Sequence, residues 1–133
     1  MTVVQVRMYR CICCGAVLTV VPAETLSRRL YSGAAIAWAL ALYGLSQLTQ
    51  VAVRGLVSPW LEVSTDSDGR WRTLSRWCAA AGEGLFTKLP RLAGSCAREV
   101  AAAAATAIAA FAVPVPEPPS LDVLAFHGAA RAA

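Results

Sequence analysis

Three closely spaced cysteines followed by a glycine constrain the fold of this chain more than any other sequence feature. Cys11 and Cys14 are separated by two residues, and Gly15 directly follows the second of them. This spacing lets two sulfur atoms face one ion while the backbone turns back over them. Residues 3–8 and 16–21, on either side of the turn, are rich in β-branched residues, which favours strands. The sequence therefore predicts a β-hairpin with a metal-binding knuckle at its turn.

The knuckle supplies only half of the ligands that a tetrahedral zinc site needs. Residues 1–10 contain no ligand residue. We therefore expect zinc bound by Cys11 and Cys14 with an incomplete ligand set, and the alternative is a vestigial thiol pair without metal. The groups that could complete the shell are those of a second copy, or Cys13, Cys78, Cys96 and His127.

The cysteine count also bears on the compartment. Five cysteines without an apolar signal segment argue against a complete disulfide framework. We expect a reducing, cytoplasmic environment. Free cysteine is often buried, so Cys78 and Cys96 are expected in the core, while His127 is expected in a solvated tail.

A mean hydropathy of +0.54 raises the question of a membrane span. The apolar run over residues 33–45 is shorter than the ~20 residues that a spanning helix needs. Residues 100–113 are mostly alanine, which contributes little transfer energy, and Pro114 ends that run. We expect neither run to cross a membrane, and a small membrane-associated protein is kept as an alternative.

Caps, periodicity and helix propensity predict a mainly helical chain after the hairpin. Ser32 is the expected N-cap of the first long helix, and Gly44 is its expected stop. The predicted helices cover residues 33–43, 47 to about 54, 70–81 and 95–111, with a short helical turn over 23–30. The proline-rich run after residue 113 favours extended geometry and leaves residues 120–133 as a weakly ordered tail.

The predicted fold class is therefore mainly α with a small N-terminal β-hairpin, which would be half of a zinc ribbon. Four segments are expected: a zinc-knuckle hairpin (1–22), a helix-turn-helix-like helical region (23–91), an alanine-rich helix (92–113) and a flexible proline-rich tail (114–133). The four tryptophans are better core anchors than base-stacking platforms, because each lies among apolar neighbours. They are Trp38, Trp60, Trp71 and Trp77.

Positive charge is concentrated in the first two thirds of the chain. The net charge is +4, and residues 1–91 hold ten basic against five acidic residues. Arg72 and Arg76 lie four residues apart, hence on one face of a predicted helix, where guanidinium groups can grip phosphates or read guanine edges. A solvated helix face is the competing interpretation.

An ordered series of residues indicates a family. The series is Tyr9-Arg10-Cys11-x-x-Cys14-Gly15, Val20-Val21-Pro22, Arg28-Arg29, Tyr31-Ser32, Gly44-Leu45, Val57-Ser58-Pro59-Trp60 and Trp71-Arg72-Thr73-Leu74-x-Arg76-Trp77. Over about residues 9–78 the chain resembles uncharacterised bacterial proteins related to insertion-element transposases, in which a zinc ribbon precedes a helix-turn-helix. The resemblance implies that Cys11 and Cys14 are metal ligands. It also implies that helices around residues 35–54 begin a DNA-binding unit, with Arg72 and Arg76 on a recognition helix.

Two departures from that family limit what the resemblance carries over. Such ribbons normally begin with another Cys-x-x-Cys upstream, so this chain is expected to be a truncated or late-initiated member. The acidic catalytic domain of transposases has no counterpart in the sequence, and neither a phosphate loop nor a paired-carboxylate motif is present. We therefore expect no enzymatic activity and no small-molecule substrate.

The sequence thus predicts a non-catalytic DNA-binding module. The expected DNA contacts on duplex DNA are Arg54, Arg70, Arg72 and Arg76. The alternative is an orphan protein-interaction fragment that binds no DNA and associates, for example as a homo-oligomer, through its alanine-rich helix.

Overall fold

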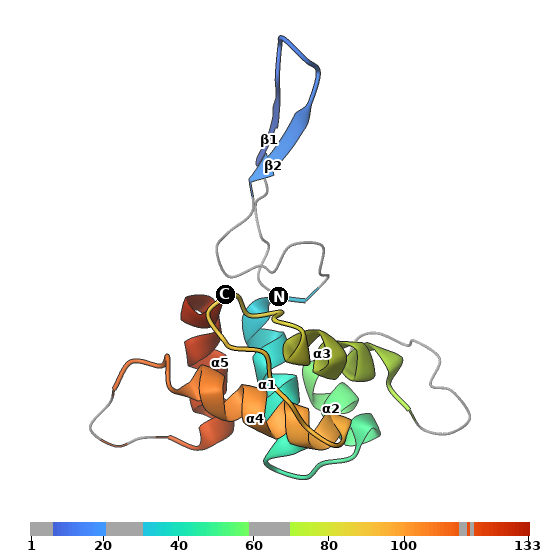
Figure 1. Cartoon of the computed structure of the whole chain (residues 1–133), viewed down its shortest axis with the longest axis vertical. Helices are drawn as coiled ribbons and strands as arrows, with labels where there is room; N and C mark the ends of the chain where they lie inside the picture. Colours follow the sequence, from blue (N-terminus) through green and yellow to red (C-terminus); the bar gives the residue numbers. More distant parts are fainter. Residues whose placement is uncertain (1–6, 21–30, 59–69, 115–116, 118) are drawn as a thin grey trace.

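The computed structural model describes residues 7–20, 31–58, 70–114, 117 and 119–133. The prediction of a mainly helical chain is confirmed (Figure 1). The elements are β1 (Arg7–Arg10), β2 (Val17–Val20), α1 (Gly33–Gly44), α2 (Gln50–Val57), α3 (Arg72–Gly82), α4 (Ala97–Ala109) and α5 (Leu121–Ala132). The helical turn expected over 23–30 and the core position expected for Trp60 lie outside the described residues.

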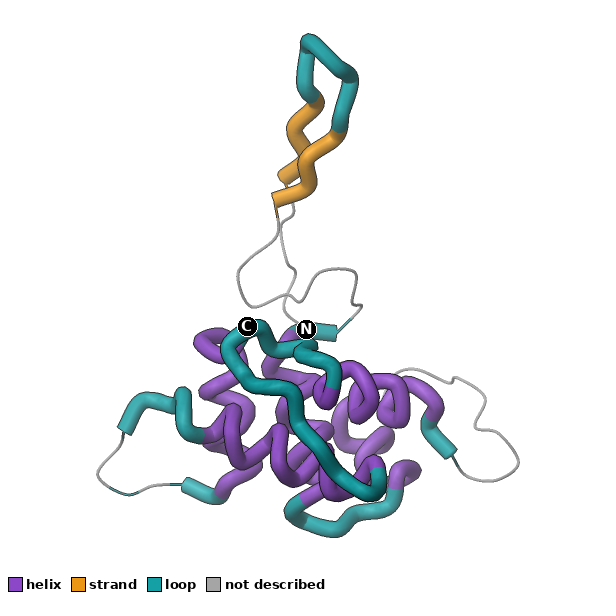
Figure 2. Tube along the Cα trace, viewed as in Figure 1, coloured by secondary structure: helices purple, strands orange, loops and turns teal. Residues whose placement is uncertain are grey.

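The two strands form an antiparallel ribbon. Arg7 is opposite Val20, and Arg10 is opposite Val17. Residues 11–16 make the turn between the strands. Figure 2 shows the ribbon standing apart from the helices.

Helix α1 lies at the centre of the helical part and contacts all four other helices. Its side chains are apolar on every side, which is typical of a helix that is buried all round. Ile36 and Leu40 have no exposed surface. Its first turn is capped as expected, because the Ser32 hydroxyl accepts a hydrogen bond from the Ala35 amide at 3.2 Å. Among the described residues, no helix has both the length and the apolar character that a membrane crossing requires.

Helix α2 begins later than the sequence predicts. The Thr49 hydroxyl accepts a hydrogen bond from the Ala52 amide at 3.2 Å, so Thr49 is the N-cap and the helix starts at Gln50. The sequence predicts that Gly55 follows this helix, but Gly55 lies inside α2. Helices α3 and α4 also start two residues later than predicted, at Arg72 and Ala97.

The expectation of a weakly ordered tail is wrong for residues 121–132, which form α5. This helix packs against α1 and α4 and buries Ala125, Ala129 and Ala132. Its buried positions are alanine and glycine, so the sequence shows little contrast between its two faces. The Trp38 indole also donates a hydrogen bond of 3.4 Å to Asp122, which joins α1 to α5.

Small residues let α1, α4 and α5 approach one another closely. A Cβ placed on Gly44 would lie 2.6 Å from the Ala102 Cα and 2.8 Å from the Ala101 carbonyl carbon. A Cβ placed on Gly128 would collide with the Ile108 carbonyl oxygen. The backbones of α1 and α4, and those of α5 and α4, are therefore in contact at these glycines. The distance between two helix axes depends on the size of the residues at the contact, so larger residues here would push the helices apart.

Basic side chains from elsewhere in the chain satisfy the last carbonyls of two helices. Arg98 donates to the Tyr43 carbonyl at 2.6 Å and to the Leu48 carbonyl at 3.3 Å, and its guanidinium lies 4.2 Å from the centre of the Tyr43 ring. Lys88 donates to the Arg131 carbonyl at the end of α5. Cations are favoured at these negative ends of helices.

Candidate nucleic-acid interface and cysteine turn

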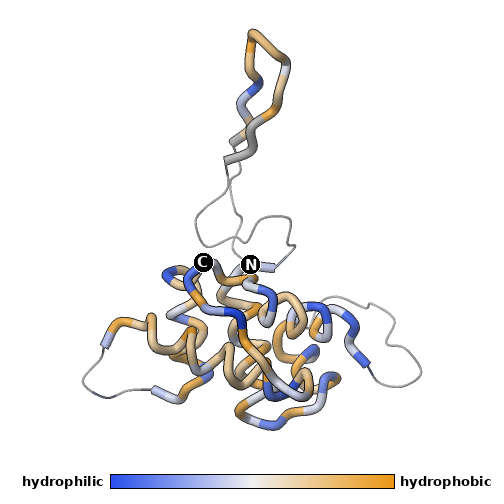
Figure 3. Tube along the Cα trace, viewed as in Figure 1, coloured by the Kyte–Doolittle hydropathy of each residue, from blue (hydrophilic) through white to orange (hydrophobic). Residues whose placement is uncertain are grey.

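Helix α3 has one buried face and one exposed basic face. Leu74, Trp77 and Cys78 are buried, whereas Arg72 and Arg76 are exposed. Figure 3 shows hydrophilic residues at the start of this helix. The buried apolar residues that pack α3 against the rest of the core therefore lie on the side opposite to both arginines.

An aromatic cluster packs the start of α3 against Tyr31, which lies just before α1. Trp71 and Trp77 pack edge-on with ring centres 5.1 Å apart, and Tyr31 packs on Trp77 at 4.9 Å. The Tyr31 hydroxyl and the buried Ser58 hydroxyl share a hydrogen bond of 2.9 Å. Each such aromatic pair contributes about 0.5–1.5 kcal/mol beyond its buried area. The expectation that Trp71 and Trp77 are core residues is confirmed, and Trp38 is half-buried against the same core.

A side chain of α2 holds the backbone immediately before α3. The Gln50 side-chain oxygen accepts a hydrogen bond of 2.7 Å from the Trp71 amide. Arg54 is one helical turn after Gln50 and therefore lies on the same face of α2. Arg70 and Arg72 directly flank Trp71 in the chain. This contact joins the Gln50 side chain of α2 to the backbone between Arg70 and Arg72.

The charge of these segments is uniformly positive. Residues 31–58 and 70–82 contain four arginines and no aspartate or glutamate. Arg70, Arg72 and Arg76 are exposed, and Arg54 is half-buried. The carboxylates Glu62, Asp66 and Asp68 occur between the two segments and lie outside the described residues. We call the set of Arg54, Arg70, Arg72 and Arg76 the arginine surface.

The connections around α2 differ in length. Residues 45–49 join α1 to α2, whereas residues 58–71 join α2 to α3. A helix-turn-helix joins its two helices by a turn of about three or four residues. The link between α2 and α3 is therefore longer than that motif uses.

The cysteine turn has a defined backbone. The Cys11 amide donates to the Ala16 carbonyl at 2.8 Å, and the Gly15 amide donates to the Cys11 carbonyl at 3.0 Å. Gly15 has a φ of 72°, a left-handed conformation that glycine adopts without steric cost. Hydrogen bonds from the backbone amides of Cys14 and Cys13 lower the pKa of the Cys11 thiol. These bonds favour the thiolate, which is the form that ligates metal.

Of the other candidate ligands, Cys13 lies in this turn, whereas Cys78, Cys96 and His127 lie outside it. Cys11, Cys13 and Cys14 are all exposed, and no group of three or more metal-binding side chains occurs within the described ranges. Cys78 is buried, as expected, and burial raises the pKa of its thiol to about 11. The expectation that Cys96 is a core residue is wrong. It is exposed, because it is the N-cap of α4 and precedes the first turn that packs.

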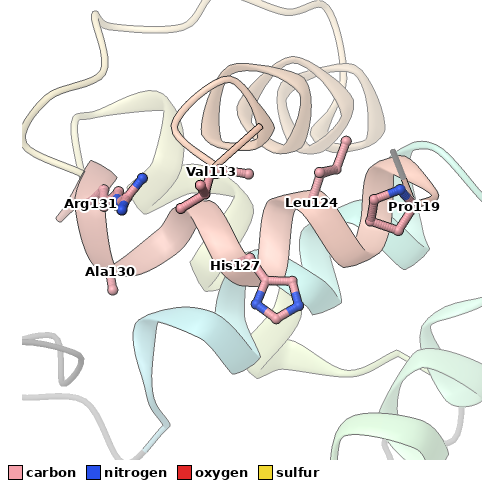
Figure 4. Close-up of a pocket in the computed structure, with 7 residues that line it drawn as sticks. Val113, Pro119, Leu124, His127, Ala130 and Arg131 are labelled. Carbon is pink, nitrogen blue, oxygen red and sulfur yellow. The ribbon is translucent and has the colours of Figure 1, made fainter. Parts of the chain in front are cut away.

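A cavity of about 350 Å³ lies between α5 and the segment before it (Figure 4). It is lined by Ala112, Val113, Pro119, Leu124, His127, Ala130 and Arg131. His127 is exposed, as expected, but it belongs to a helix. The described residues that line the cavity include no carboxylate and no thiol. His127 therefore has no partner among them for an acid–base pair or a nucleophile pair. The sequence predicts a weakly ordered tail where α5 lies and therefore gives no signal for this cavity.

Comparisons with known proteins identify no relative. No family model, curated protein or solved structure matches the chain. The resemblance to transposase-related proteins therefore stays a prediction.

Proposed function

We propose that this chain is a non-catalytic DNA-binding module that contacts duplex DNA through the arginine surface. The observation that carries the proposal is the build of α3: its aromatic and apolar face is anchored, and its arginines project from the other face. Side chains held on a packed helix lose less freedom on binding than side chains on a loop. In this proposal α3 acts as the recognition helix of a helix-turn-helix-like unit, whose link from α2 to α3 is longer than in the standard motif.

The start of α3 is the part best suited to meet a phosphate backbone. Trp71, its N-cap, makes no side-chain hydrogen bond to the first turn. The positive end of the helix dipole therefore adds to the charges of Arg70 and Arg72. Recognition helices commonly contact DNA through their N-terminal residues.

We also propose that Cys11 and Cys14 are zinc ligands. Both residues lie in the hydrogen-bonded turn at the tip of the ribbon and are exposed, and zinc binds cysteine sulfur in its deprotonated form. These two residues fit half of a tetrahedral shell.

The alternative of association through the alanine-rich helix is less favoured. Ala101, Ala104 and Ala105 have no exposed surface, because α4 packs against α1, α3 and α5. A protein partner would need another surface of the chain.

Binding to duplex DNA is expected to weaken with salt in proportion to the number of phosphate contacts. If all four arginines neutralise phosphates, log Kd should rise with log salt concentration with a slope of about 3.6. Fluorescence anisotropy of a labelled duplex, titrated with the full chain at several salt concentrations, measures this slope. Absence of binding at low ionic strength, or binding insensitive to salt, would overturn the proposal.

A further inference from the structure

The tip of the ribbon combines exposed thiols with exposed apolar side chains. Ile12 is fully exposed, Met8 is 70% exposed and Val17 is 56% exposed. The turn is coloured hydrophobic in Figure 3. Apolar side chains grouped around metal-binding residues are typical of a surface that another molecule covers.

The number of zinc ligands in the turn also indicates that a second molecule covers it. Zinc held by thiolates takes four ligands in a tetrahedron. The turn supplies Cys11, Cys13 and Cys14, and of these Cys11 and Cys14 have the two-residue spacing of a zinc knuckle. The candidates outside the turn belong to the helices: Cys78 is buried in α3, Cys96 is the N-cap of α4, and His127 lies on α5. Half a shell at an exposed tip leaves room for an identical half.

We propose that two copies of this chain share one zinc ion, held by Cys11 and Cys14 of each copy. The inference rests on the zinc ligation proposed above and not on DNA binding. A two-fold axis through the ion makes the two halves equivalent, as in most homodimers. Ile12, the most exposed apolar residue at the tip, would then be covered by the other copy.

Zinc binding at such a site releases protons and leaves a negative charge. Four thiols each lose a proton to solvent as four sulfur–zinc bonds form, so binding weakens as pH falls. Four thiolates and one Zn²⁺ leave a net charge of −2 on the site. Arg10 directly precedes Cys11 in each copy and supplies positive charge next to it.

The test uses the full chain, reduced with a phosphine and freed of metal, to which zinc is added. We expect about 0.5 zinc per chain by elemental analysis. Light scattering should show the mass rising to about twice the 14.0 kDa of one chain. A chelator should return the mass to that of the monomer.

Serine variants identify the ligands. C11S and C14S are each expected to abolish both zinc binding and zinc-dependent dimerisation. C13S, a change in the same exposed turn, and C96S, a change at an exposed helix cap, are matched controls and should behave as the unmodified chain does. Circular dichroism shows whether the helices remain, since the ribbon stands apart from them.

Other outcomes overturn the proposal in distinguishable ways. One zinc per monomer would uphold ligation and refute sharing, whereas no zinc binding would refute both. A dimer that survives the chelator but not the reductant would be a disulfide. Loss of the dimer in C13S would refute the assigned ligand pair.

Discussion

Replacing Gly44 by alanine is expected to destabilise the helical part severely. The new Cβ would lie 2.6 Å from the Ala102 Cα and 2.8 Å from the Ala101 carbonyl carbon. These are backbone atoms of α4, so relief requires α1 and α4 to move apart. Overpacking a core costs about 1–3 kcal/mol, and we expect about 3 kcal/mol or more here. The midpoint of thermal unfolding, followed by circular dichroism, should fall by about 10 °C or more.

Gly55 provides the matched control for this substitution. It lies inside α2, and apart from the backbone of its own helix a Cβ placed on it would meet no atom of the described residues within 4 Å. Alanine at this position should stabilise the chain by about 0.5–1 kcal/mol, because glycine is the poorer helix former. Equal midpoints for the Gly44→Ala and Gly55→Ala variants would contradict the close crossing of α1 and α4.

Replacing both Arg72 and Arg76 by alanine is expected to weaken DNA binding strongly without unfolding the chain. Each arginine contact contributes about 1 kcal/mol or more, so Kd should rise about thirtyfold or more. The salt slope should also fall by about 2, since two phosphate contacts are lost. Both arginines are exposed, and surface substitutions change stability by about 0.5 kcal/mol or less. Anisotropy titrations of the same duplex measure both quantities.

A variant with the same loss of charge controls for general electrostatics. Arg91 and Arg131 are exposed and lie outside the arginine surface. The double variant R91A/R131A lowers the net charge by the same two units. We expect its Kd to rise much less than that of R72A/R76A. Equal weakening in the two variants would mean that net charge, and not the arginine surface, determines the affinity.

Local signals in the sequence are enough to predict the core helices. The Ser32 cap depends on neighbouring residues, and the burial of Trp71, Trp77 and Cys78 follows from their helical spacing. The same reasoning fails for α5. Helix α5 packs closely against α4 through alanine and glycine. The same residue types are common in segments that pack against nothing. Helix propensity without amphipathic contrast does not tell the two cases apart.

Contacts between distant residues are also absent from local patterns. Arg98 binds the Tyr43 carbonyl 55 residues earlier in the chain, and Gln50 binds the Trp71 amide 21 residues later. The second of these contacts joins a side chain of α2 to the backbone immediately before α3. The choice of Arg54, Arg70, Arg72 and Arg76 as DNA contacts therefore stays a prediction from the sequence, whereas the bond between Gln50 and the Trp71 amide is visible only in the structure.

The most direct test of the proposed interface is a chemical-shift map of the 15N-labelled chain titrated with a short DNA duplex. We predict that the amides that shift most lie in α2 and in residues 70–76, and that those of α5 change little. Shifts confined to α5 or to the cavity beside it would contradict the proposal, as would a spectrum that DNA leaves unchanged at low ionic strength.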